Sequence, residues 1–583
     1  MKHVGHFIAG ELLSADNGSQ IFNPSNGKPT AIAAIGTPAE VDRAVAAARA
    51  AFPAWSALGL QNRATVMLEL RGALQNARHE LVDIVVAELG KTLADAGAEV
   101  DRAIEVLGQL ASIGSWHGGA FSPGVSRGVD AMEVRFPIGV VVAISPFNFP
   151  VLIPVVQSAM ALACGNTIVL KPSERDPSAT LRLAEIFSRA GLPQGVLNVV
   201  LGGKAIVDRL VDHPDVAGIS FVGSTPVAKA IRIAGVSRNK RVQAFGGGKN
   251  HMVVLPDADL DLAADAAVSA AYGAAGQRCM AVSVVVAVGT IGDALVHKIK
   301  DGLARLRTGD PAEAATDVGP LITAESRDRI ASYLANAASE GASVVVDGRG
   351  VVTKGDGWFL GPSLVDHVRP GMALHSDELF GPVLSIVRAD SYEEAIAIIA
   401  RHPLGNGAAI FTNDGGLARR FVDEVEAGQI GINVPIPFPV FFHNFAGWKD
   451  SAFTETKLFG PGAIAFHTRT KTVSAAGPTQ TPPKSISLFR RRSKPGVRWH
   501  AFRWLRQVRW ARSARPHDGC GDRRYGRAAR RHRCVLWRSI SLEAAGVGTE
   551  RGGNPTRRPA ARAASAARCE DRLRCHQLRQ ARG

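Results

Sequence analysis

The sequence predicts an α/β fold built as two successive lobes, followed by a basic tail of different character. Strand-like and helical segments alternate from residue 134 to a helix near Pro226, and a second alternating series runs from His251 to about Gly431. This alternation favours parallel sheets with right-handed crossovers. The length of 583 residues also exceeds a single core of about 100–200 residues, which indicates more than one lobe.

The first helices are expected after Pro38, because residues 39–55 and 61–89 are rich in Ala, Leu and Glu with apolar residues at helical spacing. The alternating series then begins at Val134. Its segments are, in order, a strand at 134–145, a helix at 151–164, a strand at 166–173, a helix at 179–191, a strand at 195–202, a helix at 204–214 and a strand at 216–223. In sheets of this kind dinucleotides bind at the carboxyl ends of the strands.

The second series predicts another lobe of similar construction. It contains, in order, segments 252–256, 261–276, 283–289, 294–306, 342–348, 384–390 and 393–403. Beyond it, Ala463–Ala475 alternates polar and apolar residues, which predicts a terminal strand that adds to another sheet.

The positive charge is confined to the tail. The whole chain has a formal net charge of +16, but residues 475–583 contain 27 Lys and Arg against 6 Asp and Glu, whereas the preceding residues contain 41 against 46. The body is therefore an ordinary, slightly acidic protein. We predict that the tail, 476–583, is disordered, and its 25 Arg against 2 Lys favour a frameshift product of GC-rich DNA. A nucleic-acid-binding arm is the functional alternative, although no recognisable motif accompanies it.

Cysteine usage and the N-terminal residues indicate the compartment. Only Cys164 and Cys279 lie in the body, which fits a reducing compartment better than a disulfide framework. Residues 1–18 resemble neither a signal peptide nor a transit peptide, and the apolar stretch 138–170 is broken by prolines and asparagines. We expect a cytoplasmic protein without a membrane span, and we expect no metal site, since Cys569, Cys575 and His576 match no zinc spacing.

The strongest chemical signal is Cys279 in Gly276-Gln277-Arg278-Cys279-Met280, which follows a helical segment. A thiolate can attack a carbonyl, and a neighbouring guanidinium or helix terminus can lower the pKa of a thiol from about 8.5 toward neutrality. We therefore predict that Cys279 is a nucleophile whose pKa is lowered by the neighbouring Arg278 or by a helix terminus. A buried structural cysteine is the alternative, and we accept that interpretation for Cys164.

Several motifs between about Val4 and Ser474 resemble, in order, those of the aldehyde dehydrogenase superfamily. Ser145-Pro146-Phe147-Asn148-Phe149-Pro150 resembles its oxyanion motif, in which the Asn amide and the Cys backbone N–H hold the developing alkoxide. Such donors contribute about 3–4 kcal/mol each to the transition state. The resemblance assigns this role to Asn148, against the alternative of a simple loop asparagine.

The resemblance also implies residues that bind NAD. Ile168–Glu174 is similar to the segment that holds the adenosine ribose, in which Lys171 binds the hydroxyls and Glu174 repels a 2′-phosphate; a surface ion pair is the alternative. Phe221–Ala228 resembles the pyrophosphate turn, with Gly223 and Ser224 before a helix N-terminus, although Ala228 stands where many members have Gly. Glu378–Val383 resembles the loop whose Glu378 holds the nicotinamide ribose and whose Phe380 orients the ring, and Phe147 joins this cofactor group.

One position departs from the hydrolytic members of the superfamily. They carry a glutamate four residues before the lysine of Phe245-Gly246-Gly247-Gly248-Lys249-Asn250-His251, and that glutamate activates the water that cleaves the thioester; here the position is Phe245. The Gly-x-Lys-Asn-His segment resembles the CoA-acylating methylmalonate-semialdehyde branch, as does Phe136–Val140. The resemblance implies that coenzyme A, rather than water, removes the thioester from Cys279.

Two arginines complete the resemblance to this branch. Arg102, on a predicted helix, and Arg278 match the pair that is thought to bind the substrate carboxylate, for which arginine is well suited; a solvated helix charge is the alternative for Arg102. The implied reaction converts methylmalonate or malonate semialdehyde to propionyl-CoA or acetyl-CoA, CO2 and NADH, as in the breakdown of valine, of pyrimidines such as thymine, or of inositol. A hydrolytic aldehyde dehydrogenase and, from another class, a protein that binds nucleic acid through its tail remain alternatives.

The resemblance finally implies a domain organisation. The expected parts are a Rossmann-like NAD-binding domain at 1–119 and 138–247, a catalytic α/β domain at 248–431, and a β-strand extension at 120–137 and 432–475. The extension is expected to pair subunits into homodimers or homotetramers.

Overall fold

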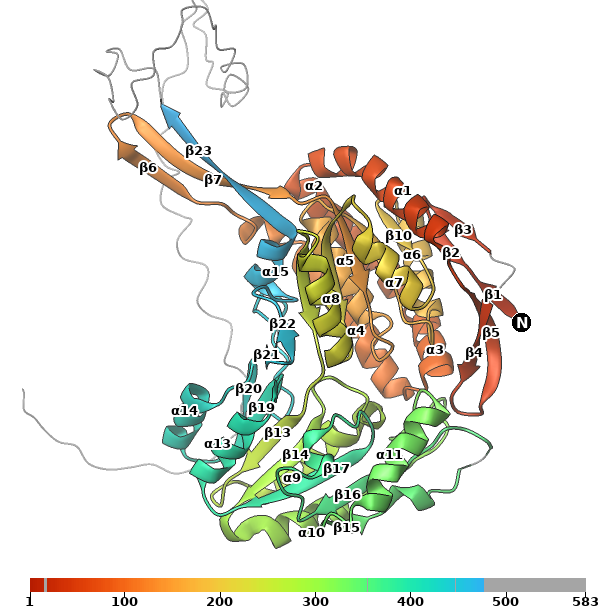
Figure 1. Cartoon of the computed structure of the whole chain (residues 1–583), viewed down its shortest axis with the longest axis vertical. Coiled ribbons are helices and arrows are strands. Elements are labelled where there is room, and N and C mark those ends of the chain that lie inside the picture. Colours follow the sequence, from red (N-terminus) through yellow and green to blue (C-terminus); the bar gives the residue numbers. More distant parts are fainter. Residues whose placement is uncertain (15–17, 354, 446, 477–583) are drawn as a thin grey trace, which may run out of the picture. The chain divides into compact units, whose positions relative to one another are not determined.

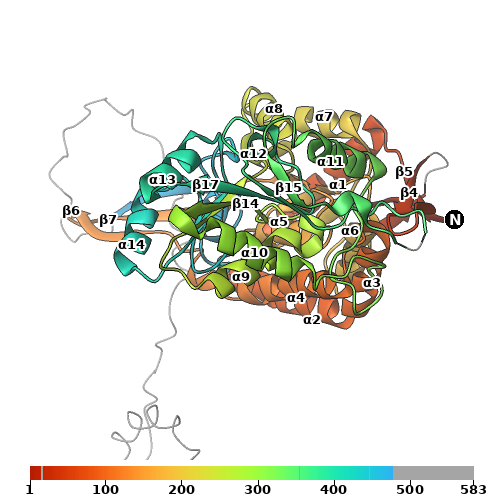
Figure 2. The ribbon, with the colours of Figure 1, turned by 90° about the horizontal axis from the view of Figure 1, so that it is seen from below.

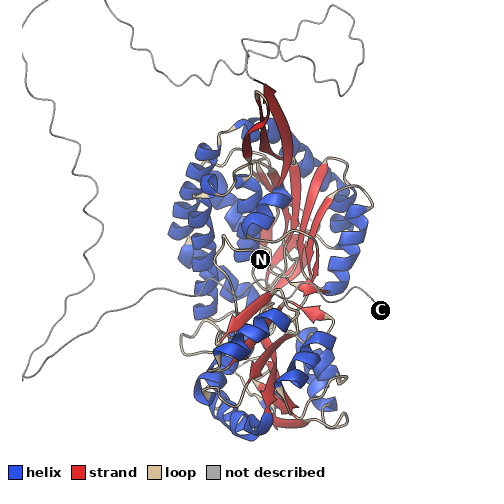
Figure 3. Ribbon diagram, turned by 90° about the vertical axis from the view of Figure 1, so that its left-hand side faces the viewer, coloured by secondary structure: helices blue, strands red, loops and turns tan. Residues whose placement is uncertain are grey.

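The computed structural model describes residues 1–14, 18–353, 355–445 and 447–476. The predicted tail lies outside the described residues except for Ala476, and so do the interpretations that concern it. The strands of the described part form two large sheets, which lie in two separate groups, together with three small ones (Figure 3). The predicted α/β class is therefore confirmed.

The strand predicted at 134–145 is divided, since its residues up to Pro137 belong to β7 (Val129–Pro137) of another sheet. The first large sheet contains β8 from that segment and the strands predicted at 166–173, 195–202 and 216–223. Its order is β22 (Ala452–Phe453), β12 (Arg241–Phe245), β11 (Val216–Val222), β8 (Val140–Ile144), β9 (Thr167–Lys171), β10 (Leu197–Val199), β2 (His6–Ile8) and β3 (Glu11–Leu13). The strands from β12 to β10 are parallel, whereas β22, β2 and β3 are antiparallel to their neighbours. Every residue of β8 and β9 is buried, which explains their almost continuous apolar sequences.

Helices cover both faces of this sheet (Figures 1 and 2). One face carries α1 (Pro38–Ala57), α7 (Lys204–Asp212) and α8 (Thr225–Val236), and the other carries α2 (Leu60–Asn76), α3 (Arg78–Leu89), α4 (Leu93–Leu110), α5 (Leu152–Ala163) and α6 (Ser178–Arg189). Alternate residues of β8 point to opposite faces, since Val140 and Val142 pack with the first group and Val141 and Ala143 with the second. The helical stretch expected at 61–89 is divided into two helices at Ala77.

The second large sheet is the predicted second lobe. Its order is β15 (Ser343–Val346), β16 (Ser363–Asp366), β17 (Val383–Ala389), β14 (Val282–Val288), β13 (Asn250–Val254), β19 (Gly407–Phe411) and β20 (Gln429–Ile432), and only the β15–β16 pair is antiparallel. The helices of this lobe are α9 (Leu260–Tyr272), α10 (Gly292–Leu303), α11 (Ala324–Asn336), α12 (Ala373–Ser376), α13 (Tyr392–Arg401) and α14 (Gly415–Glu424). The chain crosses from the first sheet to the second through residues 246–249, between β12 and β13.

A three-stranded sheet projects from the first lobe (Figure 1). It consists of β6 (Phe121–Ser126), β7 (Val129–Pro137) and β23 (Thr468–Ala476), and β7 pairs with β23 over nine residues. The segments 121–137 and 468–476 thus form this sheet, whereas residues 429–432 and 452–453 belong to the large sheets.

The strand predicted at Ala463–Ala475 is correct only in its second half. Residues up to His467 belong to helix α15 (Gly460–His467), and the strand starts at Thr468. The helix forms because Gly460 turns the chain with a φ of 67°, Pro461 fits the first helical turn, and Ile464 and Phe466 are both buried in the core.

Two small sheets remain. One contains β1 (Lys2–Val4), β5 (Lys28–Ala34) and β4 (Gly18–Asn23), and the other contains β18 (Leu404–Gly405) and β21 (Trp448–Lys449). None of the helices in the described part of the chain combines the length and the apolar character needed to cross a membrane.

Candidate active site

Cys279 lies between α9 and β14, and a tight turn before it sets its position. Residues Gly273–Gly276 form a 3₁₀ turn in which the last three residues have positive φ values of 51°, 51° and 71°. A Cβ atom at Gly276 would lie 2.2 Å from the carbonyl oxygen of Gly381, so this position requires glycine. The turn leaves Cys279 partly exposed beside a buried hydrophobic cluster.

The electrostatic setting of the thiol is the opposite of the one expected. Arg278 is held in an ion pair with Asp95, whose other oxygen accepts the backbone N–H of Ala274 at 2.8 Å. Burial, followed by the negative charge of Glu378, raises the pKa of Cys279 to about 11. The prediction that Arg278 lowers this pKa is therefore wrong, because the guanidinium is neutralised by Asp95 instead of acting on the thiol.

This pKa predicts how fast the thiol of the free protein reacts. The thiolate fraction, and with it the rate of Cys279 alkylation by iodoacetamide, should rise about tenfold per pH unit between pH 7 and 9. Mass spectrometry of the Cys279 peptide separates this reaction from alkylation of the other five cysteines. A rate that levels off near pH 8 would show instead that a cation lowers the pKa.

Asn148 lies in the loop that follows β8. Its side chain is buried, and its Nδ2 donates to the carbonyl oxygen of Gln277 at 3.0 Å, two residues before Cys279. Segments separated by more than a hundred residues thus meet here, and an amide donor lies beside the backbone of the predicted nucleophile. This arrangement can stabilise a negative charge that develops next to Cys279.

The two residues expected to contact the adenosine ribose lie together at the end of β9. Nζ of Lys171 is buried and lies 2.7 Å from Oε2 of Glu174, which is half exposed. Burial opposes ionisation of Glu174, but the charge and hydrogen bond of Lys171 outweigh it, so the pKa of Glu174 lies below its ordinary value. The structure therefore brings these residues together as an ion pair.

Other predicted cofactor residues lie at strand ends of both lobes. The rings of Phe147 and Phe380 meet edge to face at 5.7 Å, and Phe380 has a φ of 59°. Glu378, two residues before it, accepts the backbone N–H of Gly248 at 2.9 Å, and burial raises its pKa. Through the contact of Phe147 with Phe380, the loop at the carboxyl end of β8 meets the second lobe.

Gly223 and Ser224 connect β11 to α8. The N–H of Gly223 donates to the carbonyl oxygen of Phe245 at 3.1 Å, and a Cβ at Gly223 would lie 2.5 Å from the ring of Phe221. Ser224 is the exposed N-cap of α8 and makes no side-chain hydrogen bond to the helix. The N–H groups of this helix end remain available for an anion.

The two predicted substrate arginines have no partner in common among the described residues. Arg102, on α4, lies 2.6 Å from Glu105, donates to the carbonyl oxygen of Pro439 at 3.1 Å and lies 4.8 Å from the centre of the Phe438 ring. Arg278 instead binds Asp95 at the start of the same helix. The structure therefore does not bring them into one cluster.

A nucleophile, an amide donor and a helix end suited to phosphate thus lie along the line where the two lobes meet. Residues 13–473 match the model of the aldehyde dehydrogenase family. The chain belongs to this family. The match accounts for the order of the motifs and for the two-lobed fold.

Relatives with assigned activities resemble this aldehyde dehydrogenase over most of their length. A malonate-semialdehyde dehydrogenase of Pseudomonas aeruginosa is 46% identical over 82% of this chain and 97% of its own. Malonate-semialdehyde dehydrogenase 1 of Oceanobacillus iheyensis is 42% identical over 81% and 98%. The similarity therefore includes both lobes and the projecting sheet.

Solved structures resemble it equally well. A methylmalonate-semialdehyde dehydrogenase from Oceanimonas doudoroffii superposes with a TM-score of 0.81 at 42% identity, covering 82% of this chain and 99% of its own. A protein of Sinorhizobium meliloti 1021, described as a candidate methylmalonate-semialdehyde dehydrogenase and solved with NAD, gives a TM-score of 0.81 at 43% identity with the same coverage.

In this aldehyde dehydrogenase Phe245 ends β12 and is buried in the apolar cluster against which Cys279 packs. The following glycines bring the backbone close to Glu378, since a Cβ at Gly247 would lie 2.1 Å from its Oε2. Lys249 is buried and donates to the carbonyl oxygen of Asp377 at 2.7 Å, and burial lowers the pKa of Lys249 to about 8. Position 245 thus supplies a buried aromatic ring and no carboxylate.

Sequence reasoning missed several residues that support the nucleophile loop. Asn250 and Asn406 each donate to the carbonyl oxygen of Cys279 at 2.9 Å. Lys91 and Glu99 form a buried ion pair at 2.6 Å. One signal could have revealed this pair, because Glu99 falls within the apolar stripe of α4, three residues after Ala96 and four before Ala103.

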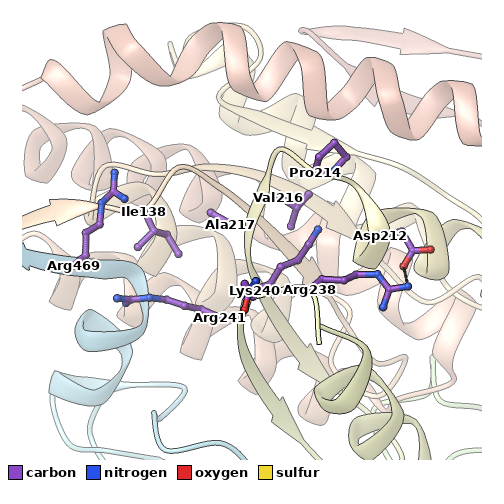
Figure 4. A pocket seen from close by; sticks show the side chains of 10 residues that line it. Ile138, Asp212, Pro214, Val216, Ala217, Arg238, Lys240, Arg241 and Arg469 are labelled. Atoms are coloured by element: carbon purple, nitrogen blue, oxygen red, sulfur yellow. Dashed lines mark ion pairs between the residues drawn. The ribbon is translucent and has the colours of Figure 1, made fainter. Parts of the chain in front are cut away.

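A pocket of about 390 Å³ lies at the amino ends of β11 and β12, and none of the predicted site residues lines it (Figure 4). Three of its charged side chains already have partners: Arg238 pairs with Asp212 at 2.6 Å, and Arg241 donates to carbonyl oxygens near the end of α15. The candidate active site is therefore Cys279 with its surroundings and not this pocket. Within the residues described, no group of three or more His, Cys, Asp or Glu is arranged to hold a metal ion.

Proposed function

We propose that this aldehyde dehydrogenase oxidises malonate or methylmalonate semialdehyde with NAD and transfers the acyl group to coenzyme A. The names of the relatives support the substrate class. The choice of coenzyme A instead of water as the acyl acceptor rests on Phe245. Its buried ring occupies the position of the water-activating glutamate. Without a carboxylate at this position, a thiol is a better acceptor than water.

The described residues fit NAD in chemical type. Lys171 and Glu174 offer a cation and a carboxylate to ribose hydroxyls, and the negative charge of Glu174 disfavours a 2′-phosphate. The uncapped amino end of α8 at Ser224 suits a pyrophosphate, and the ring of Phe380 suits a nicotinamide. When bound, NAD accepts the hydride.

Arg102 is the better candidate of the two arginines for the substrate carboxylate. Its partner Glu105 is half exposed and can be exchanged for a substrate carboxylate at little cost, because exposed ion pairs contribute only about 0–1 kcal/mol. Asp95 is mostly buried and also binds the backbone of Ala274, so Arg278 is held more firmly. We infer that Arg278 anchors the nucleophile loop.

The proposed reaction begins when the thiol of Cys279 loses its proton to solvent and its Sγ bonds to the aldehyde carbon. Asn148 and the backbone N–H of Cys279 stabilise the oxyanion that forms. Loss of hydride from the same carbon leaves a thioester on Cys279. The sulfur of coenzyme A then bonds to the acyl carbon, Cys279 leaves as a thiol, and decarboxylation of the malonyl or methylmalonyl unit gives acetyl-CoA or propionyl-CoA and CO2.

One observation favours a second candidate, a hydrolytic dehydrogenase. The charge of Glu378 raises the pKa of the Cys279 thiol, and burial raises the pKa of Glu378 itself. This carboxylate could therefore activate water in place of residue 245. Its Oε1 is already engaged by Gly248, which restricts that use. The acylating and the hydrolytic function differ in the acceptor of the acyl group, which is coenzyme A in the first and water in the second.

The test measures NADH formation from malonate and methylmalonate semialdehydes with and without coenzyme A, with mass spectrometry of the acyl product. We expect continued turnover only with coenzyme A, at least about tenfold above the rate without it, and formation of acetyl-CoA or propionyl-CoA. The Glu378→Gln variant serves as a control for the second candidate. Release of a free acid at an undiminished rate without coenzyme A would reject the acylating function.

A further inference from the structure

We propose that the buried ion pair of Lys91 and Glu99 is a positioning pair that fixes the Asn148 loop beside Cys279. The inference rests on the proposed function only in taking Cys279 as the nucleophile and Asn148 as its oxyanion donor. Both members are buried, and Nζ of Lys91 lies 2.6 Å from Oε2 of Glu99. Neither residue was singled out by any motif in the sequence.

Glu99 holds the loop from its carboxyl side. Its Oε1 accepts the backbone N–H groups of Val151 and Leu152 at 2.8 and 3.0 Å. These residues begin α5, whose N-cap is a valine without a side-chain hydrogen bond, so the carboxylate from α4 replaces the missing cap. Its negative charge also suits the positive end of the α5 dipole.

Lys91 contacts the same loop closer to Asn148. Its Nζ lies 3.8 Å from the centre of the Phe149 ring, which is a cation–π contact. Lys91 can reach this point because Gly90 ends α3 with a φ of 79°, and a Cβ there would lie 2.5 Å from Pro320. The pair therefore contacts the segment that directly follows Asn148, at Phe149, Val151 and Leu152.

The loop is in turn connected to the nucleophile. Asn148 donates to the carbonyl oxygen of Gln277, so a shift at Phe149 or Val151 moves the amide relative to Cys279. The charge of Lys91 also lowers the pKa of Cys279, against the larger effects of burial and Glu378. Lys91 further faces the buried Asp176, whose pKa is raised mainly by burial. The pair thus acts on the site by geometry and by charge.

Two double variants separate these effects without leaving a buried charge unpaired, which would cost about 3–5 kcal/mol. Lys91→Met with Glu99→Gln removes both charges but keeps an oxygen that can accept from Val151 and Leu152. Lys91→Met with Glu99→Leu removes that acceptor as well. Comparing the two variants isolates the hydrogen bonds to α5.

The first measurement is the rate of Cys279 alkylation against pH, followed at the Cys279 peptide. Both variants remove the Lys91 and Glu99 charges together, so alkylation at pH 8 should be equal in the two variants and within about twofold of the parent rate. The second measurement is acylation of Cys279 by p-nitrophenyl acetate, seen as a burst of p-nitrophenol. This attack passes through an oxyanion but needs neither NAD nor a semialdehyde.

We expect the burst rate of the Gln variant to fall only as much as its alkylation rate. The burst rate of the Leu variant should fall about tenfold further, while its alkylation rate equals that of the Gln variant. Both variants should fold, and the Leu variant should melt a few degrees lower because it loses the acceptor that caps α5. Equal bursts in the two folded variants would overturn the positioning role. Absence of Cys279 acylation in the parent protein would instead reject the nucleophile of the proposed function, and the inference with it.

Discussion

Replacing Cys279 with alanine is expected to abolish NADH formation from every aldehyde, with a loss on the order of 10⁶-fold, as when a catalytic nucleophile is removed. Among the described residues the other cysteine, Cys164, is fully buried at the end of α5. Burial raises its pKa to about 12, so it cannot replace the lost thiolate. Steady-state NADH production and mass spectrometry of the acyl-protein measure the effect.

A matched control is Cys164→Ala, which removes the other thiol of the body. It should keep turnover within about twofold and lower stability slightly, since it only shortens a small buried side chain. NAD binding by the Cys279→Ala variant shows that the fold and the cofactor residues are intact. Turnover that persists in a folded Cys279→Ala protein would remove the basis of the proposed mechanism.

Much of this site could be predicted because its residues lie in short local motifs. Asn148 follows β8, Lys171 ends β9, and Ser224 precedes α8, so each position depends on one strand and the turn after it. Parallel strands bring their carboxyl ends to one edge, and the residues therefore meet. The alternation of strand and helix was enough to predict both lobes.

The electrostatics could not be predicted in this way. Arg278 is next to Cys279 in the sequence, yet its guanidinium binds Asp95, 183 residues away. The pKa of the thiol depends on burial and on Glu378, which comes from a different strand end of the second lobe. Both effects exist only after the lobes have packed together.

The Lys91–Glu99 pair could not be predicted from the sequence for the same reason. A charged residue inside the apolar stripe of α4 indicates burial, but not its partner. The partner depends on the sharp turn at Gly90 and on α5 packing against α4. The helix at Ala463–His467 was missed because the segment continues into β23 without a break in its alternating pattern.

Replacing Asn148 with alanine is expected to lower kcat about 10²–10³-fold, because one of the two donors to the oxyanion is lost. The affinity for NAD, measured by fluorescence titration, should stay unchanged. Alkylation of Cys279 by iodoacetamide should also keep its rate, since that displacement develops no oxyanion. The variant therefore separates stabilisation of the transition state from reactivity of the thiol.

Asn406→Ala is the matched control, because Asn406 also donates to the nucleophile loop but does so at the carbonyl oxygen of Cys279. If Asn148 acted only by holding that loop, both variants would lose similar activity and both would change the alkylation rate. We expect the kcat of Asn148→Ala to fall at least about tenfold further than that of Asn406→Ala, because only Asn148 can contact the oxyanion. Asn148→Asp should be no better than alanine, since its carboxylate keeps the shape of the amide but repels the negative charge.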